Sequence, residues 1–286
     1  MEKTLLSFGH GFSAQALSRL LLPQGWRIIG TTRSEHKAPL LMAQGIEPRI
    51  WPGADMGKAL DSATHLLISA APDAGGDPVL RELRAEIAAR AGQFAWVGYL
   101  STTGVYGDHG GDWVDESTPL TPATKRGIAR VQAEAEWAAI PELPLHIFRL
   151  AGIYGPGRGP FAKVRSGTAR RIIKQGQVFS RTHVDDIAQV LAASINVPNP
   201  GAAYNVCDDD PAPPEDVIAY AAKLLGLLIP PAEDYATAEM TPMARSFYAE
   251  SKKVRNDRIK SELGVQLIYP DYRSGLRALL ALETDA

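Results

Sequence analysis

The first 33 residues contain a strand, a glycine-rich turn, a helix and a second strand, and this order constrains the fold more than any other part of the chain. An apolar run at residues 4–8 leads directly into the sequence GHGFSA at residues 9–14. A helical pattern follows, and a second apolar run at residues 26–30 ends in the sequence TTR at residues 31–33. A G-x-G-x-x-A turn between a strand and a helix is typical of dinucleotide binding.

The small residues of this turn have separate roles in that interpretation. Gly9 permits a tight turn, Gly11 allows the backbone to approach a pyrophosphate, and Ala14 allows the helix to pack closely on the strand. The free N–H groups and the positive dipole end of the helix then face the phosphates. The alternative is an ordinary helix-starting turn, because many such turns contain two glycines. The residues expected to contact a cofactor here are Gly9, Gly11, Phe12, Ser13 and Ala14.

The end of the second strand indicates which dinucleotide binds. An NAD site usually has Asp or Glu at this place, where the carboxylate accepts hydrogen bonds from the ribose 2′-OH. This chain has Thr32 and Arg33 instead, with Glu35 only just beyond. A guanidinium with hydroxyl neighbours suits a 2′-phosphate. The expected cofactor is therefore NADP, and NAD is the alternative if Arg33 is a solvated loop side chain.

Two further segments are candidates for the cofactor site. Asp55 follows the third apolar run, at residues 46–51. This type of fold often places an acid there against the adenine amino group, and an equal alternative is that Asp55 caps a helix. The sequence SAAP at residues 69–72 ends the fourth apolar run, which begins at His65. Small residues there let a ribose and pyrophosphate lie on the backbone, although a tight turn requires the same residues. The expected contacts from this segment are Ala70, Ala71 and Pro72.

Composition excludes several classes of protein. With 286 residues, 45% of them hydrophobic, the chain can bury a large core as one domain or two joined lobes. Thirty basic and 32 acidic residues give a net charge of −2 without a basic stripe, so neither nucleic acid nor a membrane is an expected partner. The single cysteine, Cys207, and the direct start on a strand without a signal peptide favour a cytoplasmic protein. No metal-ligand spacing is present, so no metal is expected.

Strand-like and helical segments alternate through the first half of the chain, and helices are expected at 78–91 and 124–139 among others. This alternation predicts an α/β fold with a doubly wound parallel Rossmann sheet over residues 1–150, and a ligand beyond the carboxyl ends of the strands. Glycine and proline become frequent after residue 150, which predicts a smaller, mostly helical substrate lobe at 151–286. The two parts are interleaved, because the chain is expected to return to the sheet near 181–206.

Five segments of the chain carry a family resemblance. They have the sequences LSTTGVYG, DESTPL, RLAGIYGPG, HVDDIA and YNV, at residues 100–107, 115–120, 149–157, 183–188 and 204–206. Their order and spacing, from residue 4 to the end, resemble the extended short-chain dehydrogenase/reductase superfamily, in its NAD-dependent epimerase/dehydratase group. The resemblance implies a Rossmann lobe that binds NAD(P), a small lobe that shapes the substrate site, and a homodimer as a common assembly.

The resemblance also shows what this chain lacks. Members usually carry a Ser or Thr that orients the substrate, and a Tyr-x-x-x-Lys pair in which Tyr is the acid/base and Lys holds the nicotinamide ribose. The matching positions, counted from Val105 and Glu134, are Thr102, Arg126 and Arg130. Arginine cannot replace tyrosine as a general acid, because its pKa stays above about 12. Arg130 could hold a ribose or phosphate, whereas Arg126 places a permanent cation beside the nicotinamide and favours an anionic ligand.

Further departures narrow the expected substrate. Dehydratases of the group carry Asp and Glu where this chain has Thr103 and Gly104, so water elimination is not expected. Sugar-nucleotide members tend to carry an Asn that contacts the diphosphate, and Gly152 stands in its place. With its G-x-G-x-x-A turn, the chain resembles the atypical short-chain dehydrogenases. Five cations follow at residues 158–171 and indicate either an anionic substrate or, more simply, one solvated helix face: Arg158, Lys163, Arg165, Arg170 and Arg171.

These observations lead to two hypotheses. The first is an NADP-dependent epimerase- or reductase-like oxidoreductase that acts on a small anionic substrate. The second is a catalytically silent NAD(P)-binding redox sensor, which the missing Tyr and Lys favour and the intact glycine turn equally allows.

Overall fold

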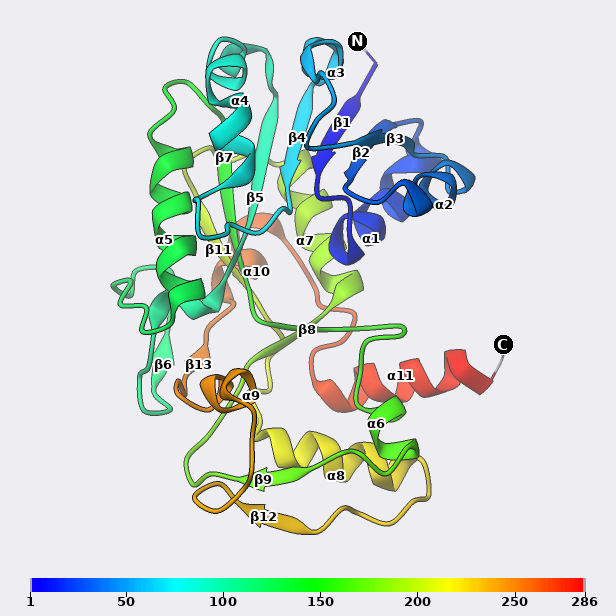
Figure 1. The fold of residues 1–286 in the computed structure, drawn as a ribbon, viewed down its shortest axis with the longest axis vertical. Coiled ribbons are helices and arrows are strands. Elements are labelled where there is room, and N and C mark those ends of the chain that lie inside the picture. Colours follow the sequence, from blue (N-terminus) through cyan, green and yellow to red (C-terminus); the bar gives the residue numbers. More distant parts are fainter. Residues whose placement is uncertain (1, 285–286) are drawn as a thin grey trace.

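Seven strands form one central sheet in the computed structural model, which describes residues 2–284 (Figure 1). In chain order they are β1 (Thr4–Phe8), β2 (Arg27–Thr32), β3 (Glu47–Ile50), β4 (His65–Ile68), β5 (Trp96–Thr102), β7 (Leu145–Leu150) and β11 (Ala203–Val206). Across the sheet the order is β11-β7-β5-β4-β1-β2-β3, and every neighbouring pair is parallel. This order confirms the doubly wound Rossmann sheet, with its switch point between β1 and β4.

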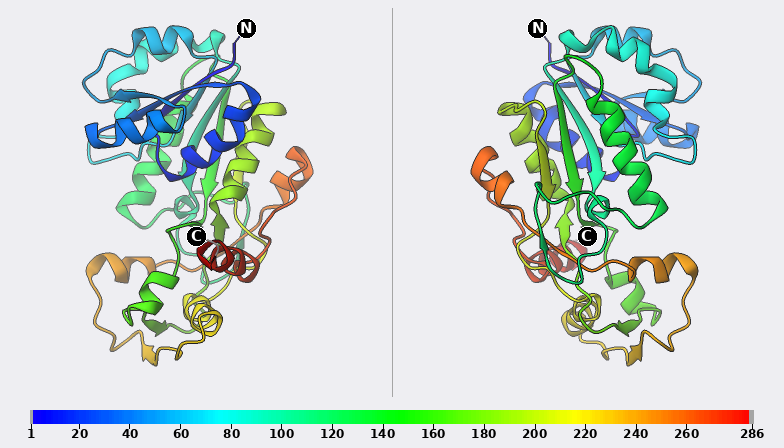
Figure 2. Two further views of the ribbon diagram at one scale, coloured as in Figure 1. Left: turned by 90° about the vertical axis from the view of Figure 1, so that its right-hand side faces the viewer. Right: turned by 90° about the vertical axis from the view of Figure 1, so that its left-hand side faces the viewer.

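Helices cover both faces of this sheet (Figure 2). They are α1 (Phe12–Leu21), α2 (Ala38–Ala43), α3 (Gly57–Ser62), α4 (Pro78–Ala88), α5 (Lys125–Ala138), α7 (Val184–Asn196) and α10 (Asp257–Leu263). Two separate apolar cores result, one beneath α1, α7 and α10 and the other beneath α3, α4 and α5. Leu5 belongs to the first core and Leu6 to the second, because successive strand residues point to opposite faces. Strands buried on both faces are therefore continuous apolar runs.

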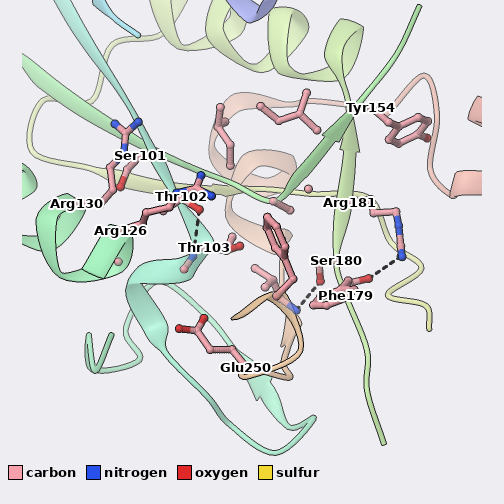
Figure 3. Close-up of a pocket in the computed structure, with 18 of the residues that line it drawn as sticks. Ser101, Thr102, Thr103, Arg126, Arg130, Tyr154, Phe179, Ser180, Arg181 and Glu250 are labelled. Atoms are coloured by element: carbon pink, nitrogen blue, oxygen red, sulfur yellow. Dashed lines mark hydrogen bonds between the residues drawn. The ribbon is translucent and has the colours of Figure 1, made fainter. Parts of the chain in front are cut away.

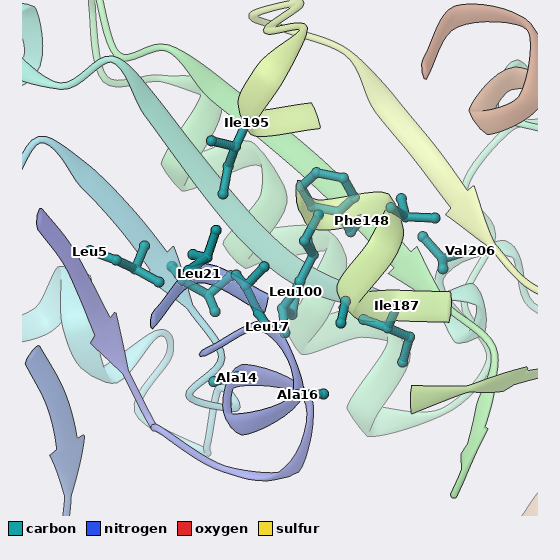
Figure 4. Close-up of a cluster of buried hydrophobic side chains, with 14 of the residues drawn as sticks. Leu5, Ala14, Ala16, Leu17, Leu21, Leu100, Phe148, Ile187, Ile195 and Val206 are labelled. Atoms are coloured by element: carbon teal, nitrogen blue, oxygen red, sulfur yellow. The ribbon is translucent and has the colours of Figure 1, made fainter. Parts of the chain in front are cut away.

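The contact between α1 and α7 places the glycine turn against the rest of the sheet. Leu17 and Leu21 of α1 lie in one buried cluster with Ile187 and Ile195 of α7, and Phe148 of β7 belongs to the same cluster (Figure 4). Full burial of such a side chain contributes about 1.5–3 kcal/mol each. The packing holds the start of α1 at the carboxyl edge of β1.

The second half of the chain adds a small lobe below the sheet in Figure 1. Its elements are short paired strands and helices, and the helices have five to thirteen residues against three in each strand. Val217 of α8 and Leu276 of α11 belong to its own apolar core, with Phe161 of α6. The elements are β8 (Gly152–Tyr154), α6 (Phe161–Arg165), β9 (Arg171–Ile173), β10 (Arg181–His183), α8 (Pro214–Leu224), β12 (Ala232–Asp234), α9 (Pro242–Phe247) and α11 (Tyr272–Thr284).

The chain crosses between the two parts several times. β11 lies at the edge of the central sheet although it follows β9 and β10 in the sequence. A two-residue pair, β6 (Trp113–Val114) with β13 (Lys253–Val254), joins the loop after β5 to the C-terminal region. The expected division at residue 150 stays a prediction. Over residues 2–284, no helix combines the length and hydropathy needed to cross a bilayer.

Candidate functional site

A cavity of about 730 Å³ lies at the carboxyl ends of the central strands (Figure 3). One wall is formed by the ends of β4, β5 and β7 together with the first turns of α5. The small lobe forms the facing wall through α8, α9, α11 and the segments before β10 and around β13. The cavity therefore lies where the switch-point rule places a ligand in this type of sheet.

The glycine turn lies beside this cavity, and its two glycines have different surroundings. Gly9 has φ +75°, and a Cβ at this residue would lie 2.8 Å from the backbone nitrogen of Ala70. A Cβ at Gly11 would meet only the Gly9 carbonyl oxygen, at 3.7 Å, and otherwise open space. Gly11 is also the N-cap of α1, and no side chain caps that helix. The start of α1 thus presents free N–H groups to open space, which fits a pyrophosphate.

The other expected cofactor residues surround this turn. Ala14 is fully buried under the sheet, and Ser13 lines the cavity with Ala71 and Pro72. At the end of β2, the Thr32 hydroxyl accepts a hydrogen bond from the Ser34 backbone N–H at 3.2 Å.

Arg33 and Asp55 are both exposed near this edge of the sheet. Arg33 forms no ion pair with any described residue, so its guanidinium is available to a phosphate. The Asp55 carboxylate accepts a hydrogen bond from the Gly57 N–H at 2.9 Å, at the start of α3. Asp55 thus lies one residue before the N-cap of α3, which is Met56, so it is not the expected cap although it bonds to the first turn. The adenine contact stays a prediction.

Thr102, Arg126 and Arg130 all line the cavity (Figure 3). The Thr102 hydroxyl accepts a hydrogen bond from the Gly104 N–H at 3.2 Å and caps the short 3₁₀ helix η4 (Thr103–Tyr106). Arg130 donates to the Leu100 carbonyl at 2.6 Å and to the Tyr99 hydroxyl at 3.0 Å. The sequence-derived positions are thus brought together, although Arg130 is already bonded to the sheet.

Arg126 differs from Arg130 because its guanidinium is exposed and forms no hydrogen bond or ion pair within residues 2–284. Its backbone position is fixed by its neighbour. A Cβ at Gly127 would lie 2.7 Å from the Gly104 carbonyl oxygen, so the first turn of α5 packs directly on η4. Arg126 is therefore held beside Thr102 with a free positive charge.

A buried polar network holds the strand ends that carry these residues. The Ser101 hydroxyl donates to the Glu134 carboxylate, and Arg149 pairs with the same carboxylate at 2.9 Å. Arg149 also donates to the Tyr106 hydroxyl at 3.0 Å, which in turn donates to the Asn205 side-chain oxygen at 2.7 Å. The network connects β5, α5, β7 and β11. All five side chains are buried, and Ser101 is the one member of the network among the described residues that line the cavity.

The hydroxyls of the two buried tyrosines near the cavity are both enclosed by the protein, that of Tyr106 against Asn205 and that of Tyr154 against α11. Burial raises the pKa of Tyr106 to about 12 and raises the pKa of Tyr154 further. The Tyr154 hydroxyl packs so closely on α11 that a Cβ at Gly275 would lie 2.1 Å from it. Cys207 is also excluded as a nucleophile, because it is fully buried and burial raises the pKa of its thiol.

The five cations at residues 158–171 do not act as one group. Arg165 pairs with Glu283 at 2.5 Å, Arg170 pairs with Glu233, and Arg171 donates to the Pro230 carbonyl at 3.1 Å. Arg158 alone among the five lines the cavity, and its guanidinium lies 5.7 Å from the ring centre of Phe12 at the start of α1. Most of this segment is therefore surface, but it is not the single helix face of the simpler interpretation, because α6 carries only Lys163 and Arg165.

Sequence reasoning missed the small-lobe side of the cavity. Lys252 donates to the Gly107 carbonyl at 2.6 Å and pairs with Glu250 at 2.8 Å, and both side chains line the cavity. Arg181 donates to two carbonyl oxygens, those of Phe179 and Ala212, each at 2.9 Å. These contacts join residues up to 145 positions apart and carry no motif. In the part of the chain that the structure describes, no group of His, Cys, Asp and Glu is arranged to hold a metal ion.

Several known proteins resemble this chain over nearly its whole length. No family model matches the sequence. A functionally unknown conserved protein from Silicibacter pomeroyi DSS is 67% identical, with 98% of each chain covered and a TM-score of 0.95. A protein of Methylobacillus flagellatus assigned as an NAD-dependent epimerase/dehydratase is 30% identical, with 99% of each chain covered and a TM-score of 0.72. Protein YeeZ of Escherichia coli (strain K12) is 28% identical over 282 residues, 94% of this chain and 97% of that protein.

More distant solved structures share the fold alone. One is the dTDP-glucose 4,6-dehydratase of Bacillus anthracis in complex with NAD, which is 17% identical, with 99% of this chain and 97% of that chain covered and a TM-score of 0.78.

Proposed function

Because the chain belongs to the NAD-dependent epimerase/dehydratase family of short-chain-dehydrogenase-like Rossmann proteins, we propose that it binds NADP and carries out a hydride-linked reduction or epimerisation of a small anionic substrate. The observation that carries the proposal is the open space beside Gly11 at the uncapped start of α1. Gly11 is exposed, so a ligand can enter this space, and packing within the fold gives no reason for a residue without a side chain there.

The residues of the turn fit a nicotinamide dinucleotide. The pyrophosphate would lie on the N–H groups at the start of α1, with the backbone of Ala70 and Ala71 beside it. The 2′-phosphate would pair with the exposed Arg33, and Thr32 would add a hydroxyl. When bound, the cofactor supplies or accepts a hydride at the nicotinamide ring. A bare 2′-OH would leave Arg33 without a partner, so NADP is preferred over NAD.

Three side chains of the cavity have roles toward the substrate. Thr102, held by the Gly104 N–H, would orient a substrate oxygen through its own hydroxyl hydrogen. Arg126 would bind an anionic group of the substrate, because its guanidinium has no other partner in the described residues. Arg130 would stabilise this arrangement from the sheet, through its bonds to Leu100 and Tyr99.

The second candidate function is a redox sensor that binds NAD(P) without catalysis. The observation that favours it is Arg126 at the position where the family has its acid/base tyrosine, together with the raised pKa of Tyr106 and Tyr154. A cofactor-bound structure discriminates between the two. A protic side chain within about 3–4 Å of the nicotinamide C4 favours the enzyme, and only arginine and apolar groups there favour the sensor.

The test of the proposed activity is a panel of aldehydes, ketones and nucleotide sugars with NADPH, followed by absorbance. Product analysis accompanies it, because epimerisation regenerates the cofactor. Turnover that falls by about 10²-fold or more in Thr102→Val, with NADP affinity unchanged, supports the enzyme. Silence in both assays with normal NADP binding supports the sensor.

A further inference from the structure

The two ends of the cavity differ in chemistry. At the sheet end, Arg126 of α5 and Arg158 near the start of α1 contribute positive charge. The small-lobe end combines an apolar and aromatic face with polar residues. The apolar face is formed by Phe179, Val217, Phe247, Tyr272 and Leu276, and the polar residues are Ser180, Arg181, Ser246, Glu250 and Lys252.

The charges of the cavity are not balanced by the protein. Glu250 is the one carboxylate among the described lining residues, and it is paired with Lys252 at 2.8 Å. Arg181 is held by two backbone carbonyls, and burial lowers its pKa. Arg126 and Arg158 have no carboxylate partner within residues 2–284. A guanidinium without a partner attracts a carboxylate or phosphate and binds it through two parallel hydrogen bonds.

Arg126 and Arg158 lie on different sides of the cavity. Arg158 stacks over the ring of Phe12, the residue that follows Gly11 in the chain. Arg158 therefore lies next to the expected pyrophosphate. Arg126 lies beside Thr102 and η4, where the first turn of α5 packs against Gly104. The charge that the substrate meets is therefore the Arg126 guanidinium.

The apolar end presents one large side chain that the fold does not cover. Phe247 lies at the end of α9, lines the cavity and keeps 53% of its surface exposed. Tyr272 and Leu276 of α11 are 2% and 1% exposed, belong to the small-lobe core and form the wall of the cavity at this end. A sugar would place hydroxyl groups against this wall, where unpaired polar groups are unfavourable. An apolar group of the substrate would instead cover the exposed ring of Phe247.

We propose that the substrate is an amphipathic organic anion, with a single carboxylate or phosphate on Arg126 and an aromatic or alkyl body against Phe247, Tyr272 and Leu276. This inference rests on the function proposed above and names the substrate class of the same cavity. It excludes nucleotide sugars as substrates, because their hydroxyl-rich body would meet the apolar wall.

Calorimetric titrations of the full chain, saturated with NADP, test this proposal with defined probes. The probes are 3-phenylpropionate, its neutral amide, acetate, phenyl phosphate and UDP-glucose. The acid is expected to bind about ten-fold or more tightly than the amide, which lacks the charge, and than acetate, which lacks the apolar body.

Two variants assign the contacts. Arg126→Gln should weaken binding of the acid about ten-fold or more and leave the amide unaffected. Phe247→Ala should weaken both the acid and the amide about three- to ten-fold. The matched controls are Arg255→Gln and Leu228→Ala, since both side chains are exposed and lie outside the cavity lining. They should change neither affinity.

The proposed substrate class is overturned by equal affinity for the acid and the amide, or by tighter binding of UDP-glucose than of the acid. Tighter binding of phenyl phosphate with the same dependence on Arg126 supports the class and identifies the anion as a phosphate. NADP binding is measured first on the same samples. If NADP itself does not bind, the proposed function fails too, whereas normal NADP binding without discrimination among the probes overturns this inference alone.

Discussion

Gly9 and Gly11 lie two residues apart in one turn, yet a side chain at each would meet different surroundings. The Gly9 position has a left-handed backbone and faces the backbone of Ala70 at 2.8 Å, so the fold requires glycine there. The Gly11 position faces open space, so the fold does not require glycine. We propose that a ligand approaching the backbone is the reason for it. The two positions therefore separate a structural role from a binding role.

Gly11→Val should keep the melting temperature of the native protein and lose NADP binding, because the new side chain occupies the space proposed for the pyrophosphate. Gly9→Ala should instead lower the melting temperature, because both its φ and its contact with Ala70 are unfavourable for a Cβ. Thermal unfolding and calorimetry on the two variants give the comparison. Native-like NADP affinity in Gly11→Val would show that the turn is merely structural.

Because the carboxyl group of Asp208, next to β11, is buried, we expect the free energy of unfolding to depend on pH. Burial raises its pKa from 3.8 to about 8, Asp210 adds to this shift, and Arg181 opposes it. The folded state thus keeps a proton that the unfolded state has released between these values, so the free energy of unfolding falls as pH rises from about 4 to about 8. Asp208→Asn should flatten this fall. Urea unfolding at several pH values measures it, and an unchanged slope in the variant would contradict this role for Asp208.

At the scale of elements, α5 is attached to the sheet by a buried ion pair. Glu134 of α5 and Arg149 of β7 lie 2.9 Å apart, with side chains 5% and 8% exposed, and Ser101 of β5 donates to the same carboxylate. The pair fixes the helix that carries Arg126 against the strand end that carries Thr102. Helix position and cavity geometry are therefore coupled.

Glu134→Ala should lower the free energy of unfolding by about 3–5 kcal/mol, because it leaves the Arg149 guanidinium buried without its carboxylate. The matched control is Asp61→Ala, which breaks the exposed pair with Arg90 and should change stability by only about 0–1 kcal/mol. Urea unfolding compares them. A loss in Glu134→Ala no greater than in the control would refute the structural role of the pair.

Local pattern was enough to predict some elements and not others. The strands β1 and β4 are mostly apolar in the sequence, because both of their faces are buried, and β2 and β7 are apolar runs interrupted by Arg27, His146 and Arg149. Helix α5 was expected at 124–139 and spans Lys125–Ala138. The cavity wall in the small lobe could not be predicted, because Phe247 and Lys252 reach it through contacts with distant segments that leave no periodic signal.

In the whole molecule, the strand order brings the glycine turn and the cavity to one edge of the sheet. The switch point lies between β1 and β4, and the ends of β4, β5 and β7 open into the same cavity. The small lobe covers this edge with segments from several parts of the chain (Figure 1). A dinucleotide on α1 and a substrate in the cavity would therefore meet at the strand ends.

NADP binding at this edge of the sheet is measured by calorimetric titration of the native protein with NADP and NAD. A charge-assisted contact from Arg33 is worth about 1.5–3 kcal/mol, so NADP should bind roughly ten- to a hundred-fold more tightly than NAD. Arg33→Ala should remove that preference and leave NAD affinity unchanged. Equal affinities in the native protein, or an unchanged preference in the variant, would show that Arg33 does not select NADP.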